Sequence, residues 1–131
     1  MKIVVNHLTR MQSGYFCAAG VDVQTKTHVR PMPAQGHLRG DLLAHSGGPF
    51  DMGMIMELGP TTPQPDRPHV EDHTFDLANV KAQGILAGSR FWNMVTQMAK
   101  PKLKAVFGDD LKMRGKSCQF SLIWIWLDFI S

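Results

Sequence analysis

The stretch from Gly14 to Met32, GYFCAAGVDVQTKTHVRPM, limits the fold of this chain more than any other. Apolar residues alternate from Tyr15 to Val23, the polar QTKT follows, and the chain continues as HVRPM. Two such runs on either side of a short polar break are typical of a β-hairpin, whose second strand Pro31 ends. The small residues 18–20 leave room for another backbone or a ligand to approach closely. We therefore predict a hairpin in this stretch.

The N-terminal KIVVNHL, residues 2–8, predicts a further strand. A period of two places Ile3 and Val5 on one face and Val4 and Leu8 on the other. Because both faces are apolar, we expect this strand to lie in the centre of a sheet.

The middle of the chain alternates between irregular and extended patterns. Residues 33–51 are rich in Gly, Pro and polar side chains, which predicts a long loop with a short extended piece at 38–43. MGMIMEL, residues 52–58, predicts a strand with one fully apolar face. The next segment, 59–69, contains four prolines and predicts an irregular surface connector.

One convincing helix is predicted, from Ser89 to Lys100. Ser89 is a suitable N-cap, and Pro101 stops the other end. Its apolar residues fall on one stripe at helical spacing: Phe91, Trp92, Val95, Met98 and Ala99.

The number and order of these elements favour one architecture. A chain of 131 residues has the length of a single domain, which we place over residues 1–131. Five to seven strands with one or two helices, and no strand-helix-strand alternation, argue against a parallel sheet. We therefore expect a mainly β fold, a small antiparallel β-barrel, closed or partly open, with one covering α-helix.

Composition places the protein among globular chains of a reducing compartment. Apolar residues make up 44% of the chain and charged residues 19%. This composition is typical of globular rather than disordered proteins. Cys17 and Cys118 lie inside apolar runs, and the start of the chain lacks a secretory pattern, so we expect a cytoplasmic protein. The longest apolar stretch, residues 120–130, is about half a bilayer span and contains Asp128. We interpret it as a buried strand and expect no membrane association.

Charge is distributed unevenly along the chain. Residues 1–76 carry six Lys and Arg against eight Asp and Glu, whereas residues 77–117 carry eight against two. The second segment therefore has a net charge of 8 − 2 = +6. Such a block fits either an anionic partner, nucleic acid above all, or a solvated surface. Its candidate phosphate contacts are Lys100, Lys102, Lys104, Lys112, Arg114 and Lys116.

Several of these segments resemble the prokaryotic dual OB domain family. YFCAAGVD followed by THVRPM resembles the opening hairpin of that family, PQPDRPHVEDHTF its proline-rich approach to an acidic pair, and VFGDDL a later Phe-Gly element. The matching residues are Cys17, Ala19, Gly20, Arg30, Pro31, Glu71, Asp72, Phe107 and Gly108. His73 departs from the pattern, in which an aromatic residue follows the acidic pair.

The resemblance implies an OB-like β-barrel and a nucleic-acid or nucleotide-related role in bacterial or phage conflict systems. It implies no catalytic residues. Because 131 residues are fewer than two OB barrels normally need, the second barrel, from about residue 77 to 131, is reduced, or the chain is a short relative.

Arg30 and the acidic pair Glu71 and Asp72 form the first candidate site. Arg30 ends a strand before a proline, which presents its side chain at a fixed place. A guanidinium in that place either binds phosphate bidentately or pairs with the two carboxylates, and the second role is the more ordinary. Because the Arg-Pro strand end and the acidic turn recur together in the family that the chain resembles, the resemblance implies that all three residues lie on one side of the barrel.

Two further sets of side chains carry weaker signals. His69 and His73 flank the acidic pair and are possible metal ligands, but no third ligand is identifiable, so we predict neither a metal nor another cofactor. Trp124 and Trp126 share a strand face, as base-stacking aromatics in single-strand-binding proteins do. The opposite face is apolar as well, which also fits a core strand or a subunit contact.

We therefore predict a non-enzymatic module that binds single-stranded DNA or RNA, or a ribonucleoprotein, through the basic segment from Lys100 to Lys116. Arg30 and the two tryptophans are its further predicted contacts. One alternative is an assembly subunit that forms a homodimer or joins a protein complex. The other is a small metal-dependent hydrolase of nucleotides or nucleic acids.

Overall fold

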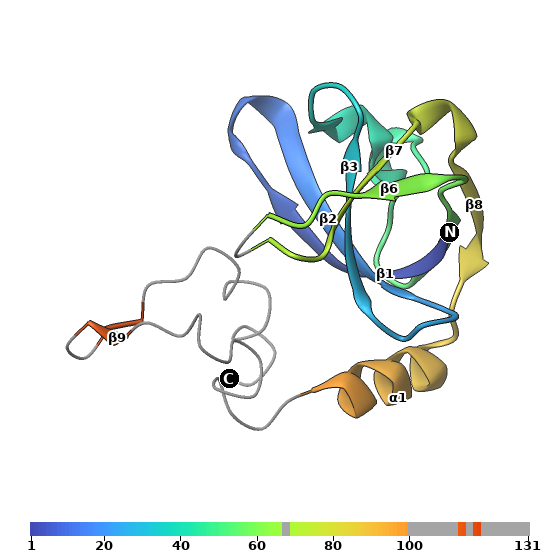
Figure 1. The fold of residues 1–131 in the computed structure, drawn as a ribbon. Helices are drawn as coiled ribbons and strands as arrows, with labels where there is room; N and C mark the ends of the chain where they lie inside the picture. Colours follow the sequence, from blue (N-terminus) through green and yellow to red (C-terminus); the bar gives the residue numbers. More distant parts are fainter. Residues whose placement is uncertain (67–68, 100–112, 115–116, 119–131) are drawn as a thin grey trace.

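The structure is a computed structural model that describes residues 1–66, 69–99, 113–114 and 117–118 (Figure 1). The described part is mainly β with one α-helix. Its strands are β1 (Lys2–Arg10), β2 (Tyr15–Asp22), β3 (His28–Pro33), β4 (Leu38–Arg39), β5 (Met54–Glu57), β6 (Thr61–Pro63), β7 (Asp72–Phe75), β8 (Lys81–Ile85), β9 (Met113–Arg114) and β10 (Ser117–Cys118). The α-helix is α1 (Gly88–Met98), and single turns of 3-10 helix lie at Gln12–Gly14, Gly40–Leu42, Ala44–Ser46 and Leu77–Asn79.

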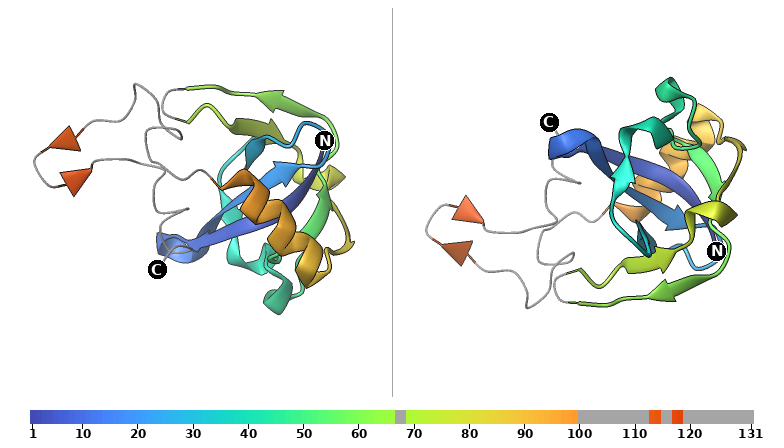
Figure 2. Two further views of the ribbon diagram at one scale, coloured as in Figure 1. Left: turned by 90° about the horizontal axis from the view of Figure 1, so that it is seen from below. Right: turned by 90° about the horizontal axis from the view of Figure 1, so that it is seen from above.

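Eight strands form one curved mixed sheet (Figures 1 and 2). The hydrogen-bonded order is β6-β7-β3-β2-β1-β5-β8, and β4 pairs with β2. Every pair in this sheet is antiparallel except β3 with β7.

The mainly β prediction is confirmed, but the sheet is mixed and is not closed into a barrel. The sheet does not close, because β6 and β8 end it without pairing to each other. The parallel pair arises because residues 34–71 form a long connection that returns the chain to the side of β3 in the same direction, as a parallel strand requires.

The predicted hairpin is present as β2 and β3. The Asp22 carboxylate closes its turn by accepting hydrogen bonds from the backbone amides of Gln24, at 2.7 Å, and Thr25, at 3.1 Å. Gly20 lies so close to β1 that a Cβ atom there would be 2.8 Å from the Val4 carbonyl oxygen. The small residues of β2 therefore serve the approach of another backbone.

β1 is central, as predicted, between β2 and β5. A β-bulge between Val5 and His7 shifts its register, however. Leu8 consequently packs against the core on the same side as Ile3 and Val5, so the predicted division of faces was wrong at Leu8.

The hydrophobic core lies against one face of the sheet. Phe16 and Phe50 meet edge to face, with ring centroids 5.5 Å apart. The buried core residues are Ile3, Val5, Phe16, Ala18, Val29, Leu38, Phe50, Met56, Leu58 and Phe75.

Three predicted boundaries differ from the structure. β5 begins only at Met54, after a turn at Gly53 that leaves Met52 exposed. β6 lies within the proline-rich segment predicted to be irregular, because an edge strand tolerates proline where no sheet amide is needed. The helix is confirmed but starts at Gly88, so Ser89 lies inside it and Ala87 provides no side-chain cap.

No helix among the described residues is long and apolar enough to cross a membrane.

Candidate functional site

Arg30 and Asp72 are brought together by the parallel register of β3 and β7, in which they are direct partners. Arg30 Nε donates to Asp72 Oδ1 and Arg30 Nη2 donates to Asp72 Oδ2, each at 2.6 Å. The Asp72 side chain is 8% exposed and that of Arg30 19%. Of the acidic pair, Asp72 therefore makes the expected contact with Arg30, as a bidentate ion pair.

This pairing determines what Arg30 is able to bind. Its hydrogen bond to Asp72 raises the pKa of the guanidinium, which is charged at every accessible pH. Two of its donors already engage a carboxylate, so little of the planar fork is left for a phosphate. The geometry favours a structural role for Arg30 and Asp72.

Glu71 occupies a different environment from Asp72. Its backbone carbonyl accepts a hydrogen bond from the amide of Arg30 at 2.8 Å and lies 3.0 Å from His73 Nδ1. Burial raises the pKa of the Glu71 carboxyl, although the nearby Arg30 opposes that shift. The two adjacent acids therefore have different roles: Asp72 holds Arg30, and Glu71 anchors the backbone.

Cys17 lies near this pair and is half-buried. Its Sγ is 3.1 Å from Met11 Sδ. Burial raises the pKa of the thiol, and the Arg30 charge only partly offsets this. A thiol that stays protonated near neutral pH is a poor nucleophile, which fits the apolar context seen in the sequence.

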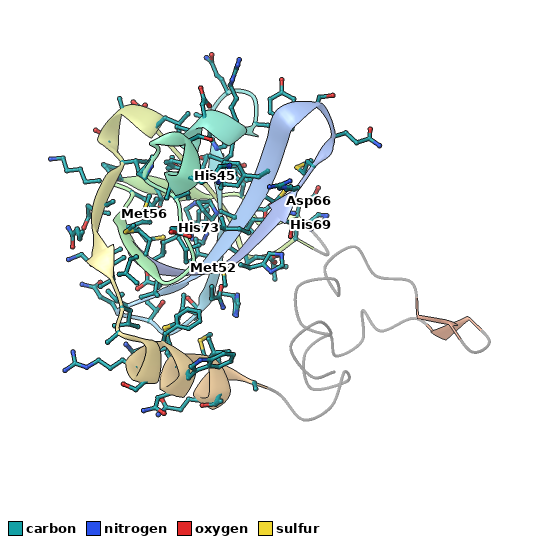
Figure 3. All side chains as sticks on the ribbon, turned by 180° about the vertical axis from the view of Figure 1, so that it is seen from behind. His45, Met52, Met56, Asp66, His69 and His73 are labelled. Carbon is teal, nitrogen blue, oxygen red and sulfur yellow. The ribbon has the colours of Figure 1, made fainter. Side chains whose placement is uncertain are left out.

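His69 and His73 do not form a metal centre in the described part of the chain. His73 lies in β7, whereas His69 precedes it and forms an isolated bridge with Asp66 (Figure 3). Within residues 1–66 and 69–99, no group of three or more His, Cys, Asp or Glu side chains is arranged to hold a metal ion.

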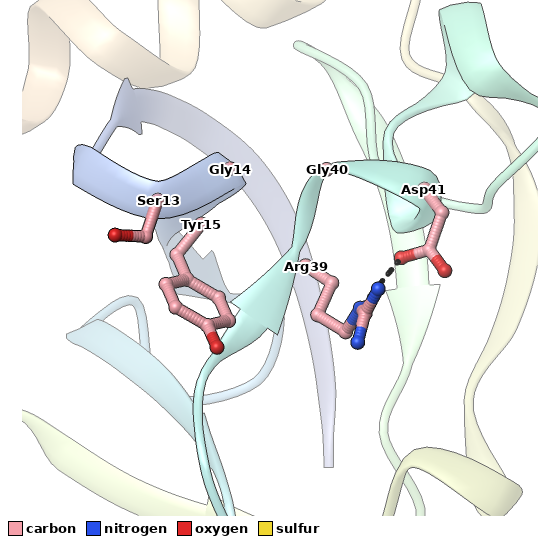
Figure 4. Close-up of a pocket in the computed structure, with 6 residues that line it drawn as sticks. All are labelled: Ser13, Gly14, Tyr15, Arg39, Gly40 and Asp41. Atoms are coloured by element: carbon pink, nitrogen blue, oxygen red, sulfur yellow. Dashed lines mark ion pairs between the residues drawn. The ribbon is translucent and has the colours of Figure 1, made fainter.

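A shallow hollow of about 230 Å³ lies at the turn that connects β1 and β2 (Figure 4). Tyr15 begins β2 and pairs in register with Arg39 of β4, so their side chains lie beside one another. The hollow is lined by Ser13, Gly14, Tyr15, Arg39, Gly40 and Asp41. Together with His37, whose ring lies beside that of Tyr15, these residues form what we call the rim site.

The rim site joins aromatic rings to an available cation. The rings of Tyr15 and His37 are 5.3 Å apart between centroids, with an interplanar angle of 59°. The Arg39 side chain is 74% exposed, and its Nε is 3.9 Å from Asp41 Oδ1, too far for a hydrogen bond. Sequence reasoning missed this site, because β4 is only two residues long and its pairing with Tyr15 leaves no periodic signal.

Most of the residues predicted to bind nucleic acid lie outside the described part of the chain. Of the six candidate phosphate contacts between Lys100 and Lys116, only Arg114 is described, in β9. The predicted contacts outside the described residues are Lys100, Lys102, Lys104, Lys112, Lys116, Trp124 and Trp126. Phe107 and Gly108, which match the family pattern, also lie outside them.

Comparison of this chain with protein-family models, with curated protein sequences and with solved structures finds no match.

Proposed function

We propose that this chain is a non-enzymatic module that binds single-stranded nucleic acid, and that the rim site contacts the strand. The observation that carries the proposal is the ring pair of Tyr15 and His37 beside the exposed guanidinium of Arg39. Proteins that hold single strands combine stacking rings with cations along the backbone.

The exposure of the rim site suits this chemistry. His37 is exposed and Tyr15 is partly exposed, so an unpaired base has access to a ring face. Among the described residues, the Arg39 guanidinium makes only the long, exposed contact with Asp41, which is worth little in water. Its guanidinium is therefore available to a phosphate, in contrast to that of Arg30.

The basic segment supplies the second part of the proposal. It lies within residues 77–117, whose net charge of +6 provides sequence-independent attraction for a phosphate backbone. The positive charge attracts the nucleic-acid strand to the domain, and the rim site then contacts its bases. An OB-like fold and a role in bacterial or phage defence are the finer form of this proposal, supported by the family resemblance of the hairpin and the acidic pair.

Fluorescence anisotropy with labelled single-stranded DNA and RNA oligonucleotides, over a series of salt concentrations, tests the proposal. Tyr15→Leu removes the ring and should weaken binding about 5- to 150-fold, the equivalent of about 1–3 kcal/mol for one stacked base. Tyr15→Phe keeps the ring and should bind as the unsubstituted chain does. Arg39→Gln should also weaken binding and reduce its salt dependence.

Arg90→Gln is the matched control, since Arg90 is an exposed cation on α1, away from the rim site. It removes the same charge and should change affinity less than Arg39→Gln does. Failure of the unsubstituted chain to bind any oligonucleotide at low salt would overturn the proposed function. Equal effects of Arg39→Gln and Arg90→Gln would remove the rim site from it.

A further inference from the structure

The edge strand β8 is open to solvent along its whole length. All five of its residues are exposed, and it bonds to β5 on one side only. Among the described residues no strand lies on its other side. A sheet edge with unpaired amides and carbonyls is a template for another extended segment.

Apolar side chains gather beside this edge. Ile85 of β8 is 63% exposed and Trp92 of α1 is 54% exposed. A Cβ atom at Gly53 would lie 3.5 Å from Ile85 Cγ2 and 3.8 Å from the Phe91 ring, so Ile85 and Phe91 converge over that glycine. The Phe91 and Trp92 rings are 6.2 Å apart between centroids, which extends the patch onto α1.

The described residues also leave the side chains of α1 incompletely buried. The helix has apolar and polar faces, yet none of its residues is fully buried. A helix of 11 residues is marginal in water by itself and depends on packing of its apolar face. The edge of β8 and the exposed face of α1 together form one surface, which we call the β8–α1 surface.

We propose that residues 120–130 of this same chain, FSLIWIWLDFI, dock on the β8–α1 surface as an added strand. If this segment is extended, both of its faces are mainly apolar. Its side chains therefore need apolar contacts on both faces. Edge pairing satisfies its backbone, while Ile85 and Trp92 offer apolar surface to its side chains. The inference is independent of nucleic-acid binding.

Charge and reach agree with this occupant. Residues 77–99 carry two cations, Lys81 and Arg90, and no carboxylate, whereas residues 120–130 carry one carboxylate, Asp128, and no cation. The 20 residues from 100 to 119 span up to about 66 Å when extended. A domain of about 100 residues has a radius of gyration of about 13 Å, so this connection reaches every part of its surface.

Photo-crosslinking of the full chain tests the docking. A p-benzoylphenylalanine in place of the exposed Ile85 should crosslink to peptides from residues 120–130 within one molecule. A mixture of isotopically light and heavy chains distinguishes this product from a crosslink between two molecules. The matched control carries the same group in place of Gln12, an exposed residue at the opposite end of β1, and should give no such product.

Hydrogen exchange supplies a second measurement on the chain without a crosslinker. Amides of Lys81–Ile85 that do not bond to β5 should also be protected from exchange. Ile125→Asp should abolish the protection of these amides. Crosslinks between light and heavy chains would assign the surface to a second copy and overturn the proposal. Absence of both the crosslink and the extra protection would overturn it as well.

Discussion

Arg30 donates two parallel hydrogen bonds, each 2.6 Å long, to Asp72, its direct partner across the parallel pair of β3 and β7. The two residues are 42 positions apart in the sequence. Their pairing fixes the register in which the second half of the sheet joins the first.

Removal of this pair should destabilise the fold. Asp72→Ala leaves the Arg30 guanidinium poorly solvated without a partner, and we expect the free energy of unfolding to fall by about 3 kcal/mol. Arg30→Lys keeps the charge but loses the planar fork, so its effect should be smaller. Urea denaturation measures both.

The exposed pair of Arg39 and Asp41 is the control for this prediction. Its side chains are 74% and 69% exposed. Asp41→Ala should therefore change the free energy of unfolding by less than about 1 kcal/mol. A similar loss for Asp41→Ala and Asp72→Ala would contradict a structural role for the Arg30–Asp72 pair.

Gly20→Ala should destabilise the sheet by about 1–3 kcal/mol, as overpacking does. The added methyl group would lie 2.8 Å from the Val4 carbonyl oxygen and 2.9 Å from Ile3 Cδ1, so β1 and β2 must separate. Gly88→Ala is the control, because a Cβ atom there meets nothing within 4 Å and alanine favours the helix. Thermal unfolding should show a lower Tm for the first variant and an equal or higher Tm for the second.

Acidification should weaken the fold through His28. Burial, with a smaller contribution from the charge of His7, lowers the pKa of His28 below its usual 6.5. The unfolded chain therefore takes up this proton at a higher pH than the folded chain does, and the free energy of unfolding falls as pH drops below about 6.5. Urea denaturation between pH 5 and 7.5 measures the slope.

His28→Gln should flatten that slope, because the glutamine does not titrate. His45→Gln is the matched control at an exposed histidine and should leave the slope unchanged. An unaltered slope in His28→Gln would mean that another group is responsible for the pH dependence.

The basic segment makes a separate prediction about salt. Combined substitution of Lys102, Lys104 and Lys116 by Ala should weaken binding to single strands. The slope of log affinity against log salt should decrease in magnitude by about 0.7 for each phosphate that the variant no longer neutralises. Anisotropy titrations at several salt concentrations give both quantities. Unchanged affinity and slope would show that the segment is only a solvated surface and would favour the assembly-subunit interpretation.

Local sequence signals predicted the first hairpin well. The alternation from Tyr15 and the polar QTKT are properties of neighbouring residues, and β2 and β3 follow them closely. The same was true of β1 and α1. The family resemblance, rather than a local pattern, connected the acidic pair with Arg30, and in the structure Asp72 lies against that arginine.

Features set by distant partners were not predictable from local patterns. β8 has a short, weakly patterned sequence and is a strand because it bonds to β5. The bulge after Val5 moves Leu8 to the core face without any signal in KIVVNHL. The rim site depends on the topology of the chain, in which residues 38–39 return to the start of β2.

The parallel pair of β3 and β7 also has a kinetic consequence. The β2–β3 hairpin closes a turn of only a few residues, which takes microseconds, whereas β7 must find β3 across the 38 residues from 34 to 71. Because the entropy of closing that loop is lost before any contact repays it, the joining of β7 to β3 should limit the folding rate. Because Arg30 and Asp72 meet in that step, Asp72→Ala should slow folding more than it accelerates unfolding.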